Sequence, residues 1–253
     1  MALITLNFFS QTLGVQTEVL VIMPQKDTVG QIGIDSNAGD AAYKCLYLLH
    51  GLSDDHTIWL RRTSIERYAS QYGICVVMPC AGRSFYCNTA YGMNYYDYIA
   101  HEIPQRMREF FHISSKREDN YIAGLSMGGY GALKIGLRES HAFCAAAGLS
   151  PVGCLNQPHH EDLIRSIFGS TEVPQEEELV YLAEKHRNDP NKPRLYMAIG
   201  TDDFLYEVSK PLRKALEETG YYDLTYYEEK AEHNWEFWDA QIQEVLKWMF
   251  DKR

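Results

Sequence analysis

Residues 121–135 read Tyr121-Ile-Ala-Gly-Leu-Ser126-Met-Gly-Gly-Tyr-Gly-Ala-Leu-Lys-Ile135, an apolar run, a glycine-flanked serine and a helical run in succession. The apolar run predicts a strand, and the residues after Gly128 have the spacing of a helix. Glycines on both sides of Ser126 let the chain turn sharply and hold the hydroxyl at the start of the helix. A serine that only caps a helix would not need those glycines. Ser126 is therefore the candidate nucleophile.

Strands and helices alternate on both sides of this turn. Residues 3–9 and 15–23 are separated by Gly14 and predict an antiparallel strand pair. Residues 43–50 and 73–79 are continuous apolar runs, typical of central strands covered on both faces. We expect helices at 64–71, 96–111, 127–137, 207–219 and 235–250, and further strands at 121–125, 143–149, 194–199 and 224–227. The alternation predicts an α/β fold, with a mostly parallel central sheet, helices on both faces and an antiparallel N-terminal strand pair.

The chain length of 253 residues fits one domain that spans residues 1–253. A polar, glycine-containing loop is expected after residue 23, through Asp40. Residues 151–193 break the alternation, because they are polar and rich in Glu, Pro and His. We expect this segment to be an insertion over the active site, at the C-terminal edge of the sheet.

Acidic residues outnumber basic ones, and the formal net charge is -10 at pH 7. Nucleic acids and anionic membranes are bound through clustered Lys and Arg, so the sequence argues against both partners and favours a small neutral or cationic substrate. No apolar run approaches the roughly 18 residues of a membrane span, and the first residues do not resemble a secretory signal. The six cysteines lack metal-type spacing and lie mostly in apolar runs. We therefore expect reduced thiols and a cytoplasmic protein.

A serine nucleophile needs a base and an acid, which follow it in the order acid then histidine in chains with this turn. The apolar run 195–199 ends at Gly200-Thr-Asp202-Asp203, which places carboxylates just past a strand end. Asp203 is preferred over its competitor Asp202, because hydrolases with this turn place the acid three residues after the glycine. His233 lies between the last strand and the final helix and is the predicted base.

Acyl transfer also needs hydrogen-bond donors for the oxyanion. We assign this role to the backbone N–H groups of Met127, directly after the nucleophile, and of Leu52, in an early strand-end loop. His50, in the same loop, is expected to be structural. Residues 83–96 form an aromatic and polar loop suited to an ester substrate. The candidates for substrate contact are Tyr91, Tyr95 and Trp59.

The histidines of the expected insertion raise the question of a metal. His159, His160, Glu161 and Asp162 are consecutive. Adjacent histidines point apart, however, and no other ligand motif accompanies them. The sequence therefore predicts no metal, and these residues are interpreted as structural or solvated.

Four separated motifs together resemble the esterase D-like family of α/β-hydrolases. They are Leu49-His-Gly-Leu-Ser with Trp59 downstream, Ala123-Gly-Leu-Ser-Met-Gly-Gly-Tyr-Gly-Ala, Gly200-Thr-Asp-Asp-Phe-Leu-Tyr-Glu and Glu232-His-Asn-Trp-Glu-Phe-Trp. The chain is most similar to the bacterial tributyrin esterases, which act on short acyl esters. The resemblance implies the α/β-hydrolase fold, a triad of Ser126, Asp203 and His233, no cofactor and often a homo-oligomer. One departure is that family members commonly have a glycine where Asp54 stands.

These observations predict a serine carboxylesterase that hydrolyses short-chain acyl esters through an acyl-enzyme. Two alternatives within enzymes remain, an S-formylglutathione hydrolase and a feruloyl or acetyl-xylan esterase, because one triad serves all of them. An acyltransferase is a different class, in which an alcohol replaces water as the acceptor. The last class is a non-catalytic binding module, against which the intact set of triad residues counts.

Overall fold

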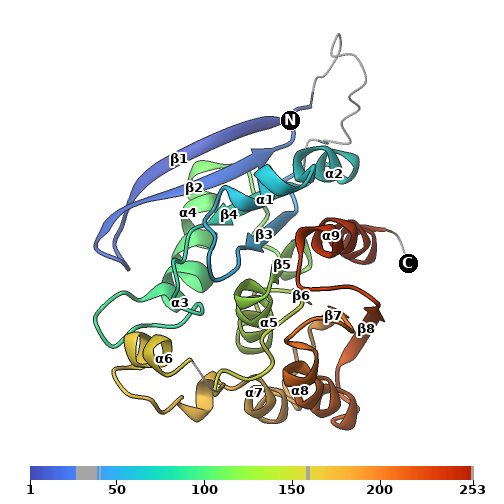
Figure 1. The fold of residues 1–253 in the computed structure, drawn as a ribbon. Helices are drawn as coiled ribbons and strands as arrows, with labels where there is room; N and C mark the ends of the chain where they lie inside the picture. Colours follow the sequence, from blue (N-terminus) through green and yellow to red (C-terminus); the bar gives the residue numbers. More distant parts are fainter. Residues whose placement is uncertain (27–38, 40, 158–159, 252–253) are drawn as a thin grey trace.

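The computed structural model describes residues 1–26, 39, 41–157 and 160–251 (Figure 1). Eight strands of the described chain form one sheet in the order β1-β2-β4-β3-β5-β6-β7-β8. They are β1 (Ala2–Ser10), β2 (Val15–Met23), β3 (Cys45–Leu49), β4 (Cys75–Pro79), β5 (Asn120–Leu125), β6 (Ala145–Leu149), β7 (Arg194–Gly200) and β8 (Asp223–Glu229). In this sheet order the strands from β4 to β8, which include β3, are parallel to one another. The strands β1 and β2 are antiparallel to their neighbours. The predicted mostly parallel sheet with an antiparallel N-terminal pair is confirmed. Most of the expected loop before Asp40 lies outside the described residues.

Helices cover both faces of the sheet, as predicted. On one face the buried apolar side chains come from α1 (Ile58–Arg62), α2 (Ile65–Tyr72) and α9 (Trp235–Phe250). On the other face they come from α4 (Ile103–Phe110), α5 (Met127–Arg138), α7 (Leu179–Lys185) and α8 (Tyr206–Glu218). The five central strands β3 to β7 are almost wholly buried, which explains their continuous apolar sequences. No helix in the described part of the chain is long and apolar enough to cross a membrane.

The expected helix at 96–111 is not a regular α-helix. It consists of α3 (Tyr95–Asp97), the π-helical turn η1 (Tyr98–Glu102) and then α4. Pro104 stands in the first turn of α4 and has no N–H, so the carbonyl of Ala100 cannot receive the usual bond from four residues ahead. A local change of helical pitch at this point follows from the missing donor. The short helix α1 was not expected from the sequence.

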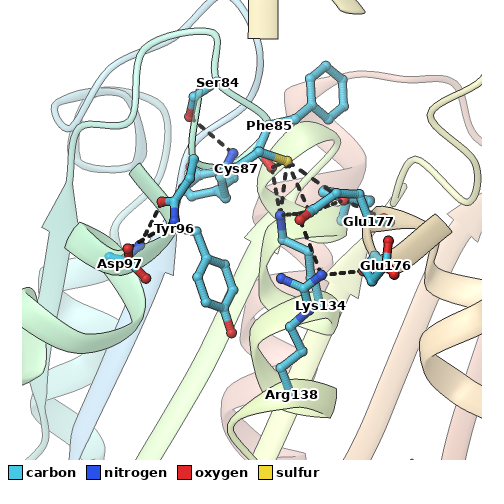
Figure 2. A network of polar contacts seen from close by, with 12 residues as sticks. Ser84, Phe85, Cys87, Tyr96, Asp97, Lys134, Arg138, Glu176 and Glu177 are labelled. Carbon is cyan, nitrogen blue, oxygen red and sulfur yellow. Dashed lines mark hydrogen bonds and ion pairs between the residues drawn. The ribbon is translucent and has the colours of Figure 1, made fainter. Parts of the chain in front are cut away.

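The described residues of 151–193 contain α6 (Glu161–Phe168), the 3-10 turn η3 (Gln175–Glu177) and α7. A buried polar cluster joins η3 to α5 and to the loop after β4 (Figure 2). In it, Lys134 Nζ on α5 lies 2.8 Å from Glu177 Oε2 and 3.0 Å from Cys87 Sγ. Tyr130, also on α5, donates its hydroxyl to the backbone carbonyl of Glu177. The segment is thus fixed to the same helix that begins after Ser126. His159 lies outside the described residues.

Candidate active site

Ser126 stands between β5 and α5 with φ 54° and ψ -117°, a backbone conformation that residues other than glycine rarely adopt. Backbone hydrogen bonds hold the chain there, and the two shortest are these. The Ser126 N–H donates to the carbonyl of Leu149 over 2.8 Å, and the Ser126 carbonyl accepts from the N–H of Tyr130 over 3.0 Å. Strain of this kind persists only where the surrounding structure enforces it, and it is typical of functional sites.

The glycines on either side of Ser126 are required by close backbone contacts. A Cβ at Gly124 would lie 2.4 Å from the carbonyl oxygen of Gly128. A Cβ at Gly128 would lie 2.5 Å from the carbonyl oxygen of Leu49 and 2.6 Å from that of His50. Side chains at these positions would therefore push apart the turn and the loop that follows β3.

The structure brings Ser126, Asp203 and His233 together. His233 Nε2 lies 3.1 Å from Ser126 Oγ, and His233 Nδ1 lies 2.8 Å from Asp203 Oδ2. The second oxygen, Asp203 Oδ1, accepts from the N–H of Leu205, and Asp203 is only 5% exposed. The competitor Asp202 is exposed, and its N–H donates to the carbonyl of Ala231. Of the two carboxylates, the geometry therefore places Asp203 against the imidazole.

Two aromatic rings hold the imidazole of His233 in place. The ring centroid of Trp238 lies 4.8 Å from that of His233, edge to face, and Trp238 Nε1 donates to Ser150 Oγ. The ring centroid of Phe204 lies 4.5 Å from that of His233, and Phe204 is 74% exposed. Both residues stand in motifs that the sequence offers, Phe204 directly after Asp203 and Trp238 five residues after His233, but their packing on the imidazole was not predicted from the sequence.

The loop after β3 lies against the nucleophile turn. A Cβ at Gly51 would be 3.9 Å from Ser126 Cβ, so Leu52 is one residue removed from a contact with the nucleophile. In the part of the chain that the structure describes, neither the Leu52 N–H nor the Met127 N–H donates to a protein acceptor. Met127 also begins α5, where the helix dipole favours negative charge. The position and free donors of both residues suit an oxyanion.

His50 is part of the scaffold beneath this loop. It is 1% exposed, its Nδ1 lies 2.7 Å from the carbonyl oxygen of Gly51, and its Nε2 accepts from the N–H of Ala81 over 2.9 Å. Burial lowers the pKa of His50. An imidazole with an acceptor on Nδ1 and a donor on Nε2 is satisfied only as the neutral form with its proton on Nδ1.

The three residues expected to contact substrate lie in different environments. Trp59 is 1% exposed, donates its Nε1–H to the carbonyl of Leu49 over 3.0 Å and packs edge to face on Trp235. It is therefore a core residue, and the assignment of substrate contact to Trp59 is corrected. Tyr91 is 72% exposed, and Tyr95 is half-buried beside Gly82. Contact of these two tyrosines with substrate stays a prediction.

Among the described residues, no group of three His, Cys, Asp or Glu side chains is placed to hold a metal ion. His160, which the sequence places beside Glu161 and Asp162, stands immediately before α6.

Residues 10–249 match the protein family described as "Putative esterase". The chain belongs to this family. An acetyl esterase of Caldicellulosiruptor saccharolyticus is 32% identical over 266 residues, which cover 98% of each chain. The substrate-bound structure of the fluorophosphonate-binding serine hydrolase F (FphF) of Staphylococcus aureus is 35% identical, with 99% of each chain covered and a TM-score of 0.86. An S-formylglutathione hydrolase (FrmB) of the same organism is 34% identical, with 99% of each chain covered and a TM-score of 0.84.

These relatives confirm the predicted α/β-hydrolase fold and the enzyme class. The chain is a carboxylic-ester hydrolase of the serine hydrolase class. A ferulic acid esterase with a TM-score of 0.80 is 23% identical and shows the fold alone.

Proposed function

We propose that Ser126, His233 and Asp203 are the catalytic triad of an esterase for short acyl esters. The observation that carries this proposal is the unbroken hydrogen-bonded line from Ser126 Oγ through both ring nitrogens of His233 to Asp203 Oδ2. Asp203 lies at the buried end of the line, whereas Ser126 and His233 are partly accessible. A buried acid, an oriented imidazole and an accessible hydroxyl are the arrangement that nucleophilic acyl transfer requires.

In the first half of the reaction, His233 Nε2 takes the proton of Ser126 as Oγ attacks the ester carbonyl. Asp203 keeps the other ring proton on Nδ1 and stabilises the imidazolium. The N–H groups of Met127 and Leu52 bind the negative oxygen of the tetrahedral intermediate. His233 then gives its proton to the leaving alcohol, and the acyl-enzyme remains. In the second half, water attacks with the same histidine as base, and the carboxylic acid leaves.

The preference for short acyl groups is supported by the segment 151–193 and by one relative. The segment begins beside the nucleophile, where the Val152 N–H donates to the Ser126 carbonyl over 3.4 Å. The apolar side chains of α6 and α7 pack inward, and none of the described residues of the segment is an exposed large hydrophobic residue. We propose that the segment borders the site without offering an apolar channel for a long chain. The relative that is 32% identical is named an acetyl esterase, and acetyl is a short acyl group.

The test is the dependence of kcat/KM on acyl length, measured with p-nitrophenyl esters from acetate to palmitate. Each methylene adds about 0.8 kcal/mol of binding only while apolar surface receives it, so kcat/KM should stop rising by about butyrate. An optimum at octanoate or longer would show that the segment forms an acyl channel and would contradict the proposal.

A second candidate is hydrolysis of S-formylglutathione, favoured by the 34% identity to a hydrolase of that name. The same triad would cleave a thioester. Rates on S-formylglutathione and on p-nitrophenyl acetate, compared in one preparation, separate the two. A kcat/KM at least about a hundredfold higher for the thioester would make it the preferred substrate class.

A further inference from the structure

Asp54 places a carboxylate in the turn that carries Leu52. The Asp54 N–H donates to the carbonyl of Gly51 over 3.2 Å and closes the turn. The side chain folds back over it, since Asp54 Oδ2 lies 3.0 Å from the position that a Cβ would take on Gly51. From that same position Ser126 Cβ is 3.9 Å away. The carboxylate can therefore be no farther from Ser126 Cβ than these two distances together.

The negative charge of Asp54 has little compensation. Burial raises the pKa of Asp54, against the influence of His50, the Gly51 backbone and Arg62. His50 is held neutral by its hydrogen bonds, and Asp54 forms no ion pair with any residue that the structure describes. The neighbouring Asp55 differs, because its carboxylate is exposed and accepts from the N–H and the hydroxyl of Thr57 over 2.8 and 2.6 Å.

The other loops of the site add charge of the same sign. Asp202 precedes Asp203, Glu232 precedes His233, and both are exposed. Three basic residues lie near Asp54 or on the other loops of the site, and all are exposed, where solvent screens them: Arg62, Arg83 and Lys230. Of the acidic residues Asp54, Asp202 and Glu232, only Asp54 is half-buried. The effect of its charge on a bound substrate is therefore screened least by solvent.

We propose that Asp54 selects substrates by charge: its carboxylate disfavours esters whose acyl or alcohol part is anionic, and the enzyme prefers neutral or cationic esters. This inference rests on the proposed triad. Repulsion between like charges in a partly desolvated site discriminates against the wrong substrate without contributing to the binding of the right one. Glutathione thioesters, which carry carboxylates, belong to the disfavoured class.

The experiment compares three p-nitrophenyl esters of similar length: the neutral valerate, the anionic hemiglutarate and the cationic 4-(trimethylammonio)butyrate. We measure kcat/KM at pH 8 and low ionic strength for the wild type, Asp54→Asn and the matched control Asp55→Asn. The asparagine keeps the size of the side chain and removes its charge. The wild type should prefer valerate over hemiglutarate by at least about tenfold, and Asp54→Asn should reduce that ratio by about fivefold.

The control Asp55→Asn should leave the ratio unchanged within about twofold, because the carboxylate it removes is exposed. The cationic ester should respond to Asp54→Asn in the opposite direction, and 0.5 M NaCl should weaken both effects in the wild type. Asp54→Gly, which has no side chain at this position, should change the ratio as Asp54→Asn does. The proposal is overturned if the ratio of kcat/KM for valerate to that for hemiglutarate is the same in the wild type and both Asp54 variants. It is also overturned if Asp55→Asn changes this ratio as much as Asp54→Asn does.

A second measurement distinguishes an error in the charge selection from an error in the proposed triad. Labelling rates of Ser126 with a neutral and a carboxylate-bearing fluorophosphonate measure the same charge selection without turnover. If Ser126 is labelled with no preference that depends on Asp54, the charge proposal alone is wrong. If Ser126 is neither labelled nor needed for ester hydrolysis, the triad and the charge selection that rests on it are both wrong.

Discussion

Replacing Glu177 with glutamine tests what fixes the segment 151–193 to the rest of the molecule. Glu177 Oε2 lies 2.8 Å from Lys134 Nζ, and Glu177 Oε1 lies 3.2 Å from Arg138 Nη2 (Figure 2). The Lys134 side chain is 0% exposed. Glutamine would keep the shape of the side chain and leave the lysine charge buried without an anion, a change that typically costs about 3–5 kcal/mol.

The pKa of Glu177 gives a second value for the loss in the free energy of unfolding. Burial opposes ionisation of this carboxyl, yet the charges of Lys134 and Arg138 lower its pKa from 4.5 to about 2. A shift of that size corresponds to about 3 kcal/mol of stability at neutral pH. Both routes therefore predict that Glu177→Gln lowers the free energy of unfolding by about 3 kcal/mol at pH 7.

The contribution of Glu177 to the free energy of unfolding decreases as the pH falls. Because the pKa of Glu177 is lower in the folded state, its contribution is complete above the unfolded pKa and is lost as the pH falls from about 5 toward 2. Urea unfolding of the wild type and Glu177→Gln should therefore differ most at pH 7, by less than half as much at pH 3, and converge only below about pH 2. Glu244→Gln, which breaks an exposed pair with Lys247, is the control and should leave the unfolding free energy nearly unchanged. A loss below about 1 kcal/mol at pH 7, or a difference at pH 3 as large as that at pH 7, would contradict this prediction.

Three further predictions concern the site. Ser126→Ala should fold with an unchanged Tm and lose at least about a thousandfold in kcat with p-nitrophenyl acetate, and turnover within tenfold of wild type would remove the serine from the mechanism. Asp203→Asn should lower kcat by about 10³–10⁴-fold, because only the carboxylate fixes the His233 tautomer. Asp202→Asn should have a small effect, and the reverse order would transfer the role to Asp202. Trp59→Phe should lower the unfolding free energy by about 1–3 kcal/mol, because the Leu49 carbonyl loses its donor, while KM changes by less than about twofold. A large rise in KM at full stability would return Trp59 to the substrate site.

The sequence predicted the sheet well because its central strands are buried on both faces. Such strands must be apolar at every position, and the resulting runs around Leu46, Val77 and Ile122 stand out from the helical spacing between them. The short helix α1 was not predicted, because five residues are too few to show a helical period. The π-helical turn η1 was not predicted for another reason, since it depends on the backbone bond that Pro104, in the first turn of α4, cannot donate.

The meeting of the three proposed catalytic side chains was predictable because each of them follows a strand end within four residues. The carboxyl ends of parallel strands meet at one edge of the sheet, so Ser126 after β5, Asp203 after β7 and His233 after β8 are brought together by topology. The packing of Phe204 and Trp238 on His233 was not predictable. It depends on how the loops after β7 and β8 fold against each other, for example through the bond from the Thr201 N–H to Glu229 at the end of β8 and the bond from the Asp202 N–H to Ala231 in the loop after it.

The burial of Trp59 has a physical cause that applies to the end of β3 and the whole loop after it. Three consecutive carbonyls, one at the end of β3 and two in the loop, each accept a side-chain hydrogen bond: that of Leu49 from Trp59, that of His50 from Tyr86 and that of Gly51 from the His50 ring. A loop that keeps an N–H free for substrate must turn its carbonyls toward the interior, where buried acceptors need donors. Indole, phenol and imidazole groups supply such donors from within an apolar core. Aromatic residues beside an oxyanion motif are therefore needed to hold its carbonyls inward, so their presence in the sequence does not by itself indicate contact with substrate.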